Sequence, residues 1–150
     1  IANAERRAVR LGENEIVPRL SDLHAVSASM MGKLELEYTG DDRANEAPLD
    51  RLMNRAILAV FDRSIAIDRL GKVSEYFANG WGVEVSDQMR AEEYLEGVRA
   101  IPGLREAIDD LGSFESPALM AAAAEFVFEG LHLHQKLNKD IEGGRTTYRS

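Results

Sequence analysis

The sequence contains no cysteine among its 150 residues. This absence excludes disulfide bridges, thiolate zinc sites and cysteine nucleophiles, and it favours an intracellular protein. Long hydrophobic runs are also missing, because the longest mostly apolar segment is 118–128, shorter than the roughly 20 residues that a bilayer-spanning helix needs. No charged-then-apolar leader opens the chain. We therefore expect a soluble, cytoplasmic protein that has no membrane partner.

Positive charge is scarce, since 18 lysines and arginines stand against 26 aspartates and glutamates, for a net charge of -8. Such a molecule repels nucleic acid and anionic lipid, so no nucleic-acid partner is expected. The charge is uneven along the chain. Residues 84–115 hold nine acids against three arginines, whereas residues 131–150 hold four bases against two acids. Two faces of opposite sign are therefore expected.

Motifs that carry chemistry are missing as well. The chain has no G-x-x-x-x-G-K-[ST] phosphate loop, no G-x-G-x-x-G and no G-x-S-x-G elbow. Its three histidines are His24, His132 and His134, and the last two are spaced to lie on different sides of a helix, while zinc helices use positions four apart. We expect no catalytic residue, no cofactor-binding residue and no metal ligand in this chain.

Hydrophobic spacing predicts a mainly α-helical bundle. The length of the chain suits one globular unit. Gly12, Gly80 and Gly112 mark the C-terminal ends of helices. The Ser116–Pro117 pair, a cap followed by proline, marks the N-terminal start of one. The expected helices cover about residues 2–11, 20–31, 48–70, 73–79, 87–100, 102–112 and 116–138, and the tail 142–150 is expected to fray.

The segment from Pro48 to about Leu70 has the clearest helical pattern. Apolar residues recur at three- and four-residue steps, which is typical of a helix with one buried face. We predict that this helix is the centre of the core and that four of its side chains are strongly buried: Leu52, Ile57, Val60 and Phe61.

A small β element is also indicated. Residues 33–38 alternate charged and apolar side chains, which favours a strand, although a continued helix remains an alternative. After Trp81 and Gly82, residues 83–85 could pair with 34–38 as a two-stranded ribbon.

Two segments are candidates for contacts. Trp81 stands between two glycines and either fills the core, the commoner role, or anchors a partner. In the segment 130–139 we expect the three leucines to dock on the body, while the polar side chains make contacts outside the domain: His132, His134, Lys136 and Lys139. The basic residues Arg6, Arg7 and Arg10 are expected to form salt bridges.

Two stretches together resemble a known family. They are AERRAVRLGENEIVPRLSDLHAVSASMMGKLELEY at 4–38 and EFVFEGLHLHQKLNKD at 125–140, and Val17, Leu20, Asp22 and Leu23 fit the pattern V-x-x-[IL]-x-D-[IL]. Both are similar to the C-terminal region of magnesium chelatase subunit I-like AAA+ ATPases, which are related to the MoxR family. The resemblance implies that residues 1–26 end the AAA+ lid and that residues 27–150 form a helical C-terminal extension.

The resemblance also implies a function. The chain would be a noncatalytic module that mediates subunit or client contacts, while the parent chain binds ATP and Mg²⁺ upstream of Ile1. Its partners would be other subunits of an AAA+ ring and a protein with a von Willebrand A-type domain. The opening inside a helical pattern fits a piece of a longer chain, and no nucleotide-binding residue of the family can be carried onto this sequence.

Two other functions stay open. One is a free-standing helical interaction or regulatory domain with no ATPase attached. The other is a small metal-dependent enzyme, which needs His24, His132 and His134 to meet beside carboxylates in one cleft.

Overall fold

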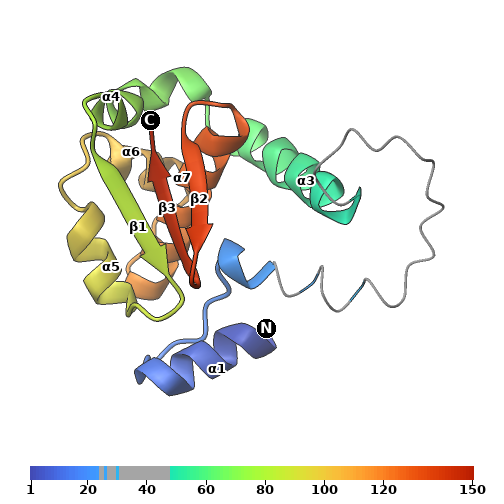
Figure 1. Ribbon diagram of the computed structural model, residues 1–150. Helices are drawn as coiled ribbons and strands as arrows, with labels where there is room; N and C mark the ends of the chain where they lie inside the picture. The colour runs from blue at the N-terminus through green and yellow to red at the C-terminus, as the bar shows by residue number, and fades with distance from the viewer. Residues whose placement is uncertain (24–25, 27–29, 31–47) are drawn as a thin grey trace.

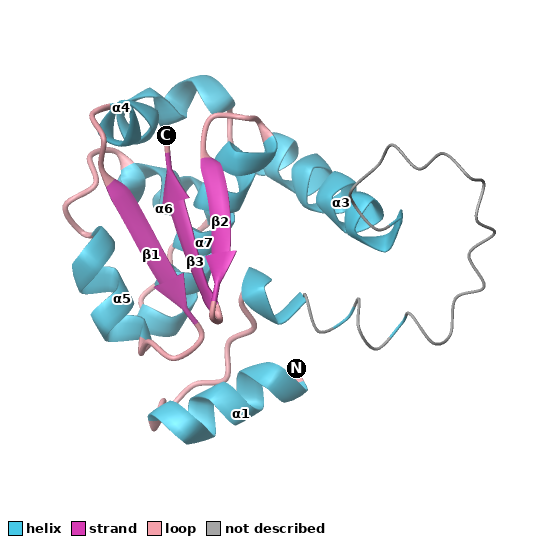
Figure 2. Cartoon of the chain, viewed as in Figure 1, coloured by secondary structure: helices cyan, strands magenta, loops and turns pink. Residues whose placement is uncertain are grey.

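The computed structural model describes residues 1–23, 26, 30 and 48–150. It is mainly α-helical with one small antiparallel sheet, as the sequence predicts (Figures 1 and 2). The helices are α1 (Ala2–Leu11), α3 (Pro48–Ser64), α4 (Gly71–Ala78), α5 (Ala91–Val98), α6 (Leu104–Leu111) and α7 (Pro117–Leu133), with short 3₁₀ turns η1 (Leu20–Leu23) and η2 (Ile67–Leu70). The strands are β1 (Gly82–Ser86), β2 (Asn138–Glu142) and β3 (Arg145–Arg149).

Helix α7 is the centre of the core. Ser116 caps it by accepting a hydrogen bond from the Leu119 amide at 3.4 Å, and Pro117 occupies the first turn, as predicted. The helix is apolar on nearly every side, which is typical of a helix surrounded by protein. Helices α3, α5 and α6 all pack against it. Among its fully buried side chains are Val127, Phe128 and Leu131.

Helix α3 docks on α7 through Phe61, which is completely buried. The Phe61 ring sits over Gly130, where a Cβ atom would come within 2.0 Å of ring carbons. Gly130 is therefore a notch in α7 that only a glycine leaves open. We call this contact the Phe61–Gly130 notch.

The prediction that α3 is the central helix is wrong. Its helix ends at Ser64, and Leu52 and Val60 are 64% and 45% exposed, while Ile57 is half-buried. The apolar spacing is that of a helix, but Leu49 and Phe61 are the side chains of α3 that the body buries. Phe61 faces α7 at the Phe61–Gly130 notch, so the side of α3 that bears Leu52 points away from α7.

The sheet has the order β1-β3-β2. Val83 lies opposite Tyr148 and Val85 opposite Thr146, and this face is turned toward the helices. The outer face is a ladder of exposed charges, in which Glu84 pairs with Arg145 at 3.4 Å. The strand predicted at 83–85 is thus confirmed, and β3 is its partner among the described strands. The predicted partner, 34–38, lies outside the described residues, as does most of the helix expected at 20–31.

The C-terminal tail differs from the prediction. Helix α7 ends at Leu133 instead of near 138, and the tail forms the β2–β3 hairpin instead of fraying. Gly143 and Gly144 have φ values of 58° and 80°, which is the backbone that a two-residue hairpin turn requires. These two glycines, which also fit the fraying tail expected from the sequence, form the turn of the hairpin.

The remaining helix boundaries are close to those expected. Gly12 ends α1 with φ of 65°, and α6 ends at Gly112. Helix α5 begins at Ala91, later than predicted, because Ser86 stays in β1 and its hydroxyl accepts a hydrogen bond from the Gln88 amide. In the described ranges, no helix combines the length and apolar character needed to cross a bilayer.

Candidate functional site

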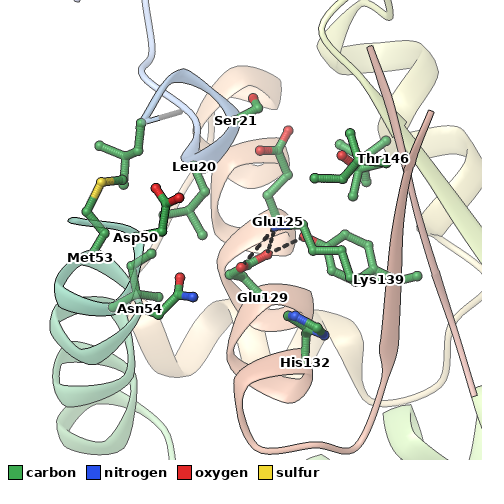
Figure 3. A pocket seen from close by; sticks show the side chains of 15 residues that line it. Leu20, Ser21, Asp50, Met53, Asn54, Glu125, Glu129, His132, Lys139 and Thr146 are labelled. Carbon is green, nitrogen blue, oxygen red and sulfur yellow. Dashed lines mark hydrogen bonds and ion pairs between the residues drawn. The ribbon is translucent and has the colours of Figure 1, made fainter. Parts of the chain in front are cut away.

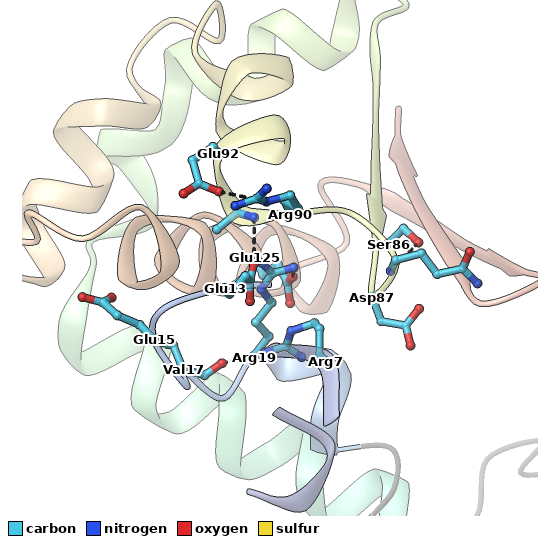
Figure 4. Close-up of polar contacts among 12 residues, drawn as sticks. Arg7, Glu13, Glu15, Val17, Arg19, Ser86, Asp87, Arg90, Glu92 and Glu125 are labelled. Carbon is cyan, nitrogen blue, oxygen red and sulfur yellow. Dashed lines mark hydrogen bonds and ion pairs between the residues drawn. The ribbon is translucent and has the colours of Figure 1, made fainter. Parts of the chain in front are cut away.

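A buried network of ion pairs joins the first residues of the chain to α7 (Figure 4). Arg7 is 3% exposed, and its Nη1 donates to both carboxylate oxygens of Asp22 at 2.9 Å. Arg19 is 4% exposed, with its guanidinium 3.4 Å from the Glu13 carboxylate and 3.8 Å from the Glu125 carboxylate. Buried arginines of this kind need partners, because an unpaired buried charge is costly.

The same region ties residues 1–23, which we call the N-terminal arm, to the body. Glu13 accepts a hydrogen bond from the Ala91 amide at 2.9 Å, at the start of α5. Arg10 donates to the Asp87 carbonyl at 2.6 Å. The expectation that these arginines form salt bridges is confirmed for Arg7 and Arg10. Polar contacts, several of them buried, therefore help to hold the arm to the body.

Glu125 is the one carboxylate of this network that belongs to α7. Burial raises its pKa to about 7, and the attraction of Arg19 and Arg7 opposes that rise only in part. Its Oε1 atom and the facing Nη1 of Arg19 lack hydrogen-bond partners in the described part of the chain. Glu125 is therefore an incompletely hydrogen-bonded, buried carboxyl group at the junction between arm and helix.

This environment predicts a pH-dependent stability. The folded pKa of about 7 exceeds the ordinary value of 4.5, so the folded state binds the proton more tightly and stability falls as pH rises between them. Each pKa unit corresponds to about 1.4 kcal/mol, so the fall is on the order of 3 kcal/mol. Glu125→Gln is expected to remove most of this fall in urea melts at pH 5 and pH 8. Glu115→Gln, which removes a surface charge, is the control, and an unchanged pH dependence in Glu125→Gln contradicts the assignment.

A cavity of about 380 Å³ lies beside this network, between α3, α7 and the hairpin (Figure 3). On its wall Lys139 donates to Glu129 at 2.8 and 3.0 Å, and the Tyr148 hydroxyl donates to Glu129 at 2.6 Å. Burial and the neighbouring Glu129 raise the pKa of Tyr148 far above its ordinary value. Apolar side chains such as Leu20 and Ile57 complete the wall.

Two of the carboxylates on this wall, Glu125 and Glu129, lie close to basic side chains. Lys139 neutralises Glu129, and Arg19 stands near Glu125. Residues 1–23 and 48–150, with 26 and 30, contain no group of three or more acids, histidines or cysteines arranged to hold a metal ion. The arrangement is suited to fixing elements against each other, with a polar cavity left between them.

The structure gives the predicted polar residues different roles. The Nδ1 atom of His132 lies 3.0 Å from the Leu137 carbonyl, and Nε2 of His134 lies 2.7 Å from Asp62 on α3. Lys136 is exposed. Lys139 does not point outward as predicted, since its side chain is 11% exposed and paired with Glu129. His24 lies outside the described residues.

The leucines of the same segment behave largely as predicted. Leu131 and Leu137 are buried, which confirms that the segment docks on the body, while Leu133 is half-buried.

Trp81 lies on the surface, 60% exposed, in the turn between α4 and β1. Its ring stacks on Tyr76, with centroids 5.9 Å apart and planes 19° apart. The prediction that it fills the core is wrong, because its side chain lies on the surface against Tyr76. The alternative, an anchor for a partner, agrees with an exposed and preorganised aromatic side chain.

Four residues of these contacts are not predicted from the sequence: Arg19, Glu125, Glu129 and Tyr148. A signal was present for two of them, because Glu125 and Glu129 are four apart inside the most apolar helix of the chain. Charged residues in such a helix are rarely buried without a partner.

No protein-family model, curated protein or solved structure matches this chain.

Proposed function

We propose that the chain is a noncatalytic, mainly α-helical C-terminal module of a magnesium chelatase subunit I-like AAA+ ATPase, which makes subunit or client contacts. The proposal starts from the two stretches that resemble that family. The observation that supports it best is that these stretches meet in space. Arg19 of the first stretch faces Glu125 of the second at 3.8 Å, within the buried network.

This contact gives the module a physical means of coupling. A lid that moves in a nucleotide cycle would pull on the N-terminal arm, and the arm is fixed to α7 and to the start of α5. Because α7 contacts α3, α5 and α6, the body would move with the arm as one piece. Trp81, exposed and stacked on Tyr76, is the proposed anchor for the client or for a neighbouring subunit.

ATP and Mg²⁺ would act in the parent chain, upstream of Ile1. The 150 residues alone are expected neither to bind nor to hydrolyse ATP, because they contain no phosphate loop. Calorimetric titration of the 150-residue chain with MgATP tests this. A flat titration is the expected result, and a clear isotherm with a Kd on the order of 1–100 µM contradicts it.

A free-standing interaction domain is the second candidate, and the continuous core around α7 favours it, since the described body has its own buried centre. The coding sequence separates the two. A Walker phosphate loop encoded upstream of Ile1 in the same reading frame supports the ATPase module. Its absence from the complete reading frame contradicts that proposal and leaves the interaction domain.

A further inference from the structure

The cavity between α3, α7 and the β2–β3 hairpin has the size and the mixed lining of a small-molecule site (Figure 3). Its volume of about 380 Å³ lies within the range of roughly 300–1,000 Å³ that ligand pockets occupy. Apolar side chains of η1 and α3 line it, among them Leu20, Met53 and Ile57. Charged side chains of α7 and the hairpin, such as Glu129 and Lys139, line it as well. The cavity can therefore hold a molecule that is apolar in one part and polar in another.

The charge of the lining indicates the charge of the ligand. Three of the described lining residues are acids, Asp50, Glu125 and Glu129, and one is a lysine, Lys139, so the lining has a formal charge of -2. Nζ of Lys139 already donates to both carboxylate oxygens of Glu129, at 3.0 and 2.8 Å. Arg19, 3.8 Å from Glu125, is not a lining residue. An anionic ligand would thus meet no lysine or arginine that is still available, whereas a cationic ligand would be attracted.

The lining also offers hydrogen-bond acceptors. Oε1 of Glu125 has no hydrogen-bond partner in the described part of the chain, although the residue is only 3% exposed. Two turns further along α7, Nδ1 of His132 lies 3.0 Å from the Leu137 carbonyl, which can only accept, so Nδ1 is the donor. Nε2 of the neutral ring is then an acceptor. A ligand that suits these groups donates hydrogen bonds.

We propose that this cavity binds a small organic cation, with a primary ammonium group at the Glu125 carboxylate and an apolar body against Met53 and Ile57. A primary ammonium group supplies a positive charge and three N–H donors, which complement an acidic lining rich in acceptors. The apolar body gains from burial against the side chains of η1 and α3. The site requires no nucleotide and no ATPase domain, so it is independent of the proposed function.

Titration with three probes that share one ring, followed by amide NMR spectra, tests the ligand class. At pH 8, above the pKa of about 7 of Glu125, benzylamine is a cation, benzyl alcohol is neutral and benzoate is an anion. Benzylamine is expected to bind with a Kd on the order of 1 mM, and the other two probes about tenfold or more weakly. If benzylamine does not bind, or if benzyl alcohol or benzoate binds as tightly, the proposal is overturned.

Met53→Trp tests the place of binding, because the larger side chain fills part of the cavity from its apolar side. Benzylamine is expected to bind this variant about tenfold or more weakly. Leu52→Trp is the matched control, since Leu52 is the neighbouring residue of α3, is 64% exposed and does not line the cavity. It should bind benzylamine as the wild type does. No loss in Met53→Trp, or equal losses in the two variants, overturns the assignment to this cavity.

Glu125→Gln tests the position of the ammonium group, because it removes the charge and keeps the shape of the side chain. Benzylamine is expected to bind about tenfold more weakly, while the binding of benzyl alcohol stays unchanged. Glu115→Gln, at an exposed position outside the lining, should leave both affinities at the wild-type value. Circular dichroism melts show that each variant is folded. Unchanged binding of benzylamine to a folded Glu125→Gln variant overturns the position given to the ammonium group.

A lysine side chain of another protein presents the same ammonium group, so a glycine peptide with one central lysine is titrated beside benzylamine. The peptide is expected to bind about tenfold or more weakly, because a cavity of about 380 Å³ suits a small molecule better than a polypeptide. Tighter binding by the peptide overturns the small-molecule assignment. None of these results bears on the upstream phosphate loop, so the proposed function is judged separately.

Discussion

Phe61→Ala is expected to lower the free energy of unfolding by about 3 to 5 kcal/mol, the usual cost of truncating a fully buried aromatic side chain. Phe61 has no exposed surface and fills the space over Gly130. Its ring also lies 5.6 Å from the rings of Phe126 and His134. Removing it leaves a cavity between α3 and α7. Urea denaturation followed by circular dichroism measures the loss.

Leu52→Ala is the matched control, because it truncates an apolar side chain of the same helix that is 64% exposed. Its expected effect is within about 0.5 kcal/mol, as for most surface substitutions, when measured at low protein concentration. A loss below about 1 kcal/mol in Phe61→Ala, or equal losses in the two variants, contradicts the orientation of α3 described above.

Gly130→Ala tests the other half of the Phe61–Gly130 notch. The added methyl group would lie 2.0 Å from the Phe61 ring, so the variant is expected to lose roughly 1–3 kcal/mol, as overpacked cores do. In the Phe61→Ala background that loss should disappear. Gly97→Ala in α5 meets no atom within 4 Å and should stabilise the protein by about 0.5–1 kcal/mol. Additive effects of Phe61→Ala and Gly130→Ala contradict a direct contact.

Lys139→Met is expected to cost a further large amount, about 3 to 5 kcal/mol, because it removes the partner of a buried carboxylate. Glu129 is 5% exposed and accepts hydrogen bonds from Lys139 and Tyr148. Without the lysine, its charge stays buried with one hydroxyl donor. Thermal or urea unfolding measures the effect.

Lys136→Met is the control, since Lys136 is exposed three residues away. Its effect should stay within about 0.5 kcal/mol. The double variant Glu129→Gln with Lys139→Met should recover much of the loss, because no charge is then left buried. If Lys139→Met behaves like Lys136→Met, the lysine points outward as the sequence suggested and the ion pair with Glu129 is not formed.

Local sequence signals predicted the parts of the fold that depend on neighbouring residues. The prediction failed where burial depends on contacts between residues that are far apart in the sequence. Gly12 and the Ser116–Pro117 pair fix helix ends through their own backbone preferences, so they were read correctly. The burial of α3 depends on Gly130, almost seventy residues away from Phe61 in sequence, and an apolar pattern does not reveal which side meets such a notch. The hairpin was missed because two adjacent glycines fit both a loose tail and a tight turn.

The candidate site was harder to foresee. The pairing of Arg7 with Asp22 spans fifteen residues, and that of Arg19 with Glu125 spans more than a hundred. Sequence spacing carries no information on such contacts. The core position favoured for Trp81 is wrong for a related reason, since the two flanking glycines do not show whether the turn faces the core or the solvent.

Steady-state ATP hydrolysis by the product of the complete coding sequence, measured beside the 150-residue chain alone, tests the proposed function most directly. The account predicts Mg²⁺-dependent hydrolysis by the complete product and none by the 150 residues. Hydrolysis by the 150-residue chain, or a complete and folded product that neither binds nor hydrolyses ATP, would contradict the assignment of this chain as a noncatalytic module of an AAA+ ATPase.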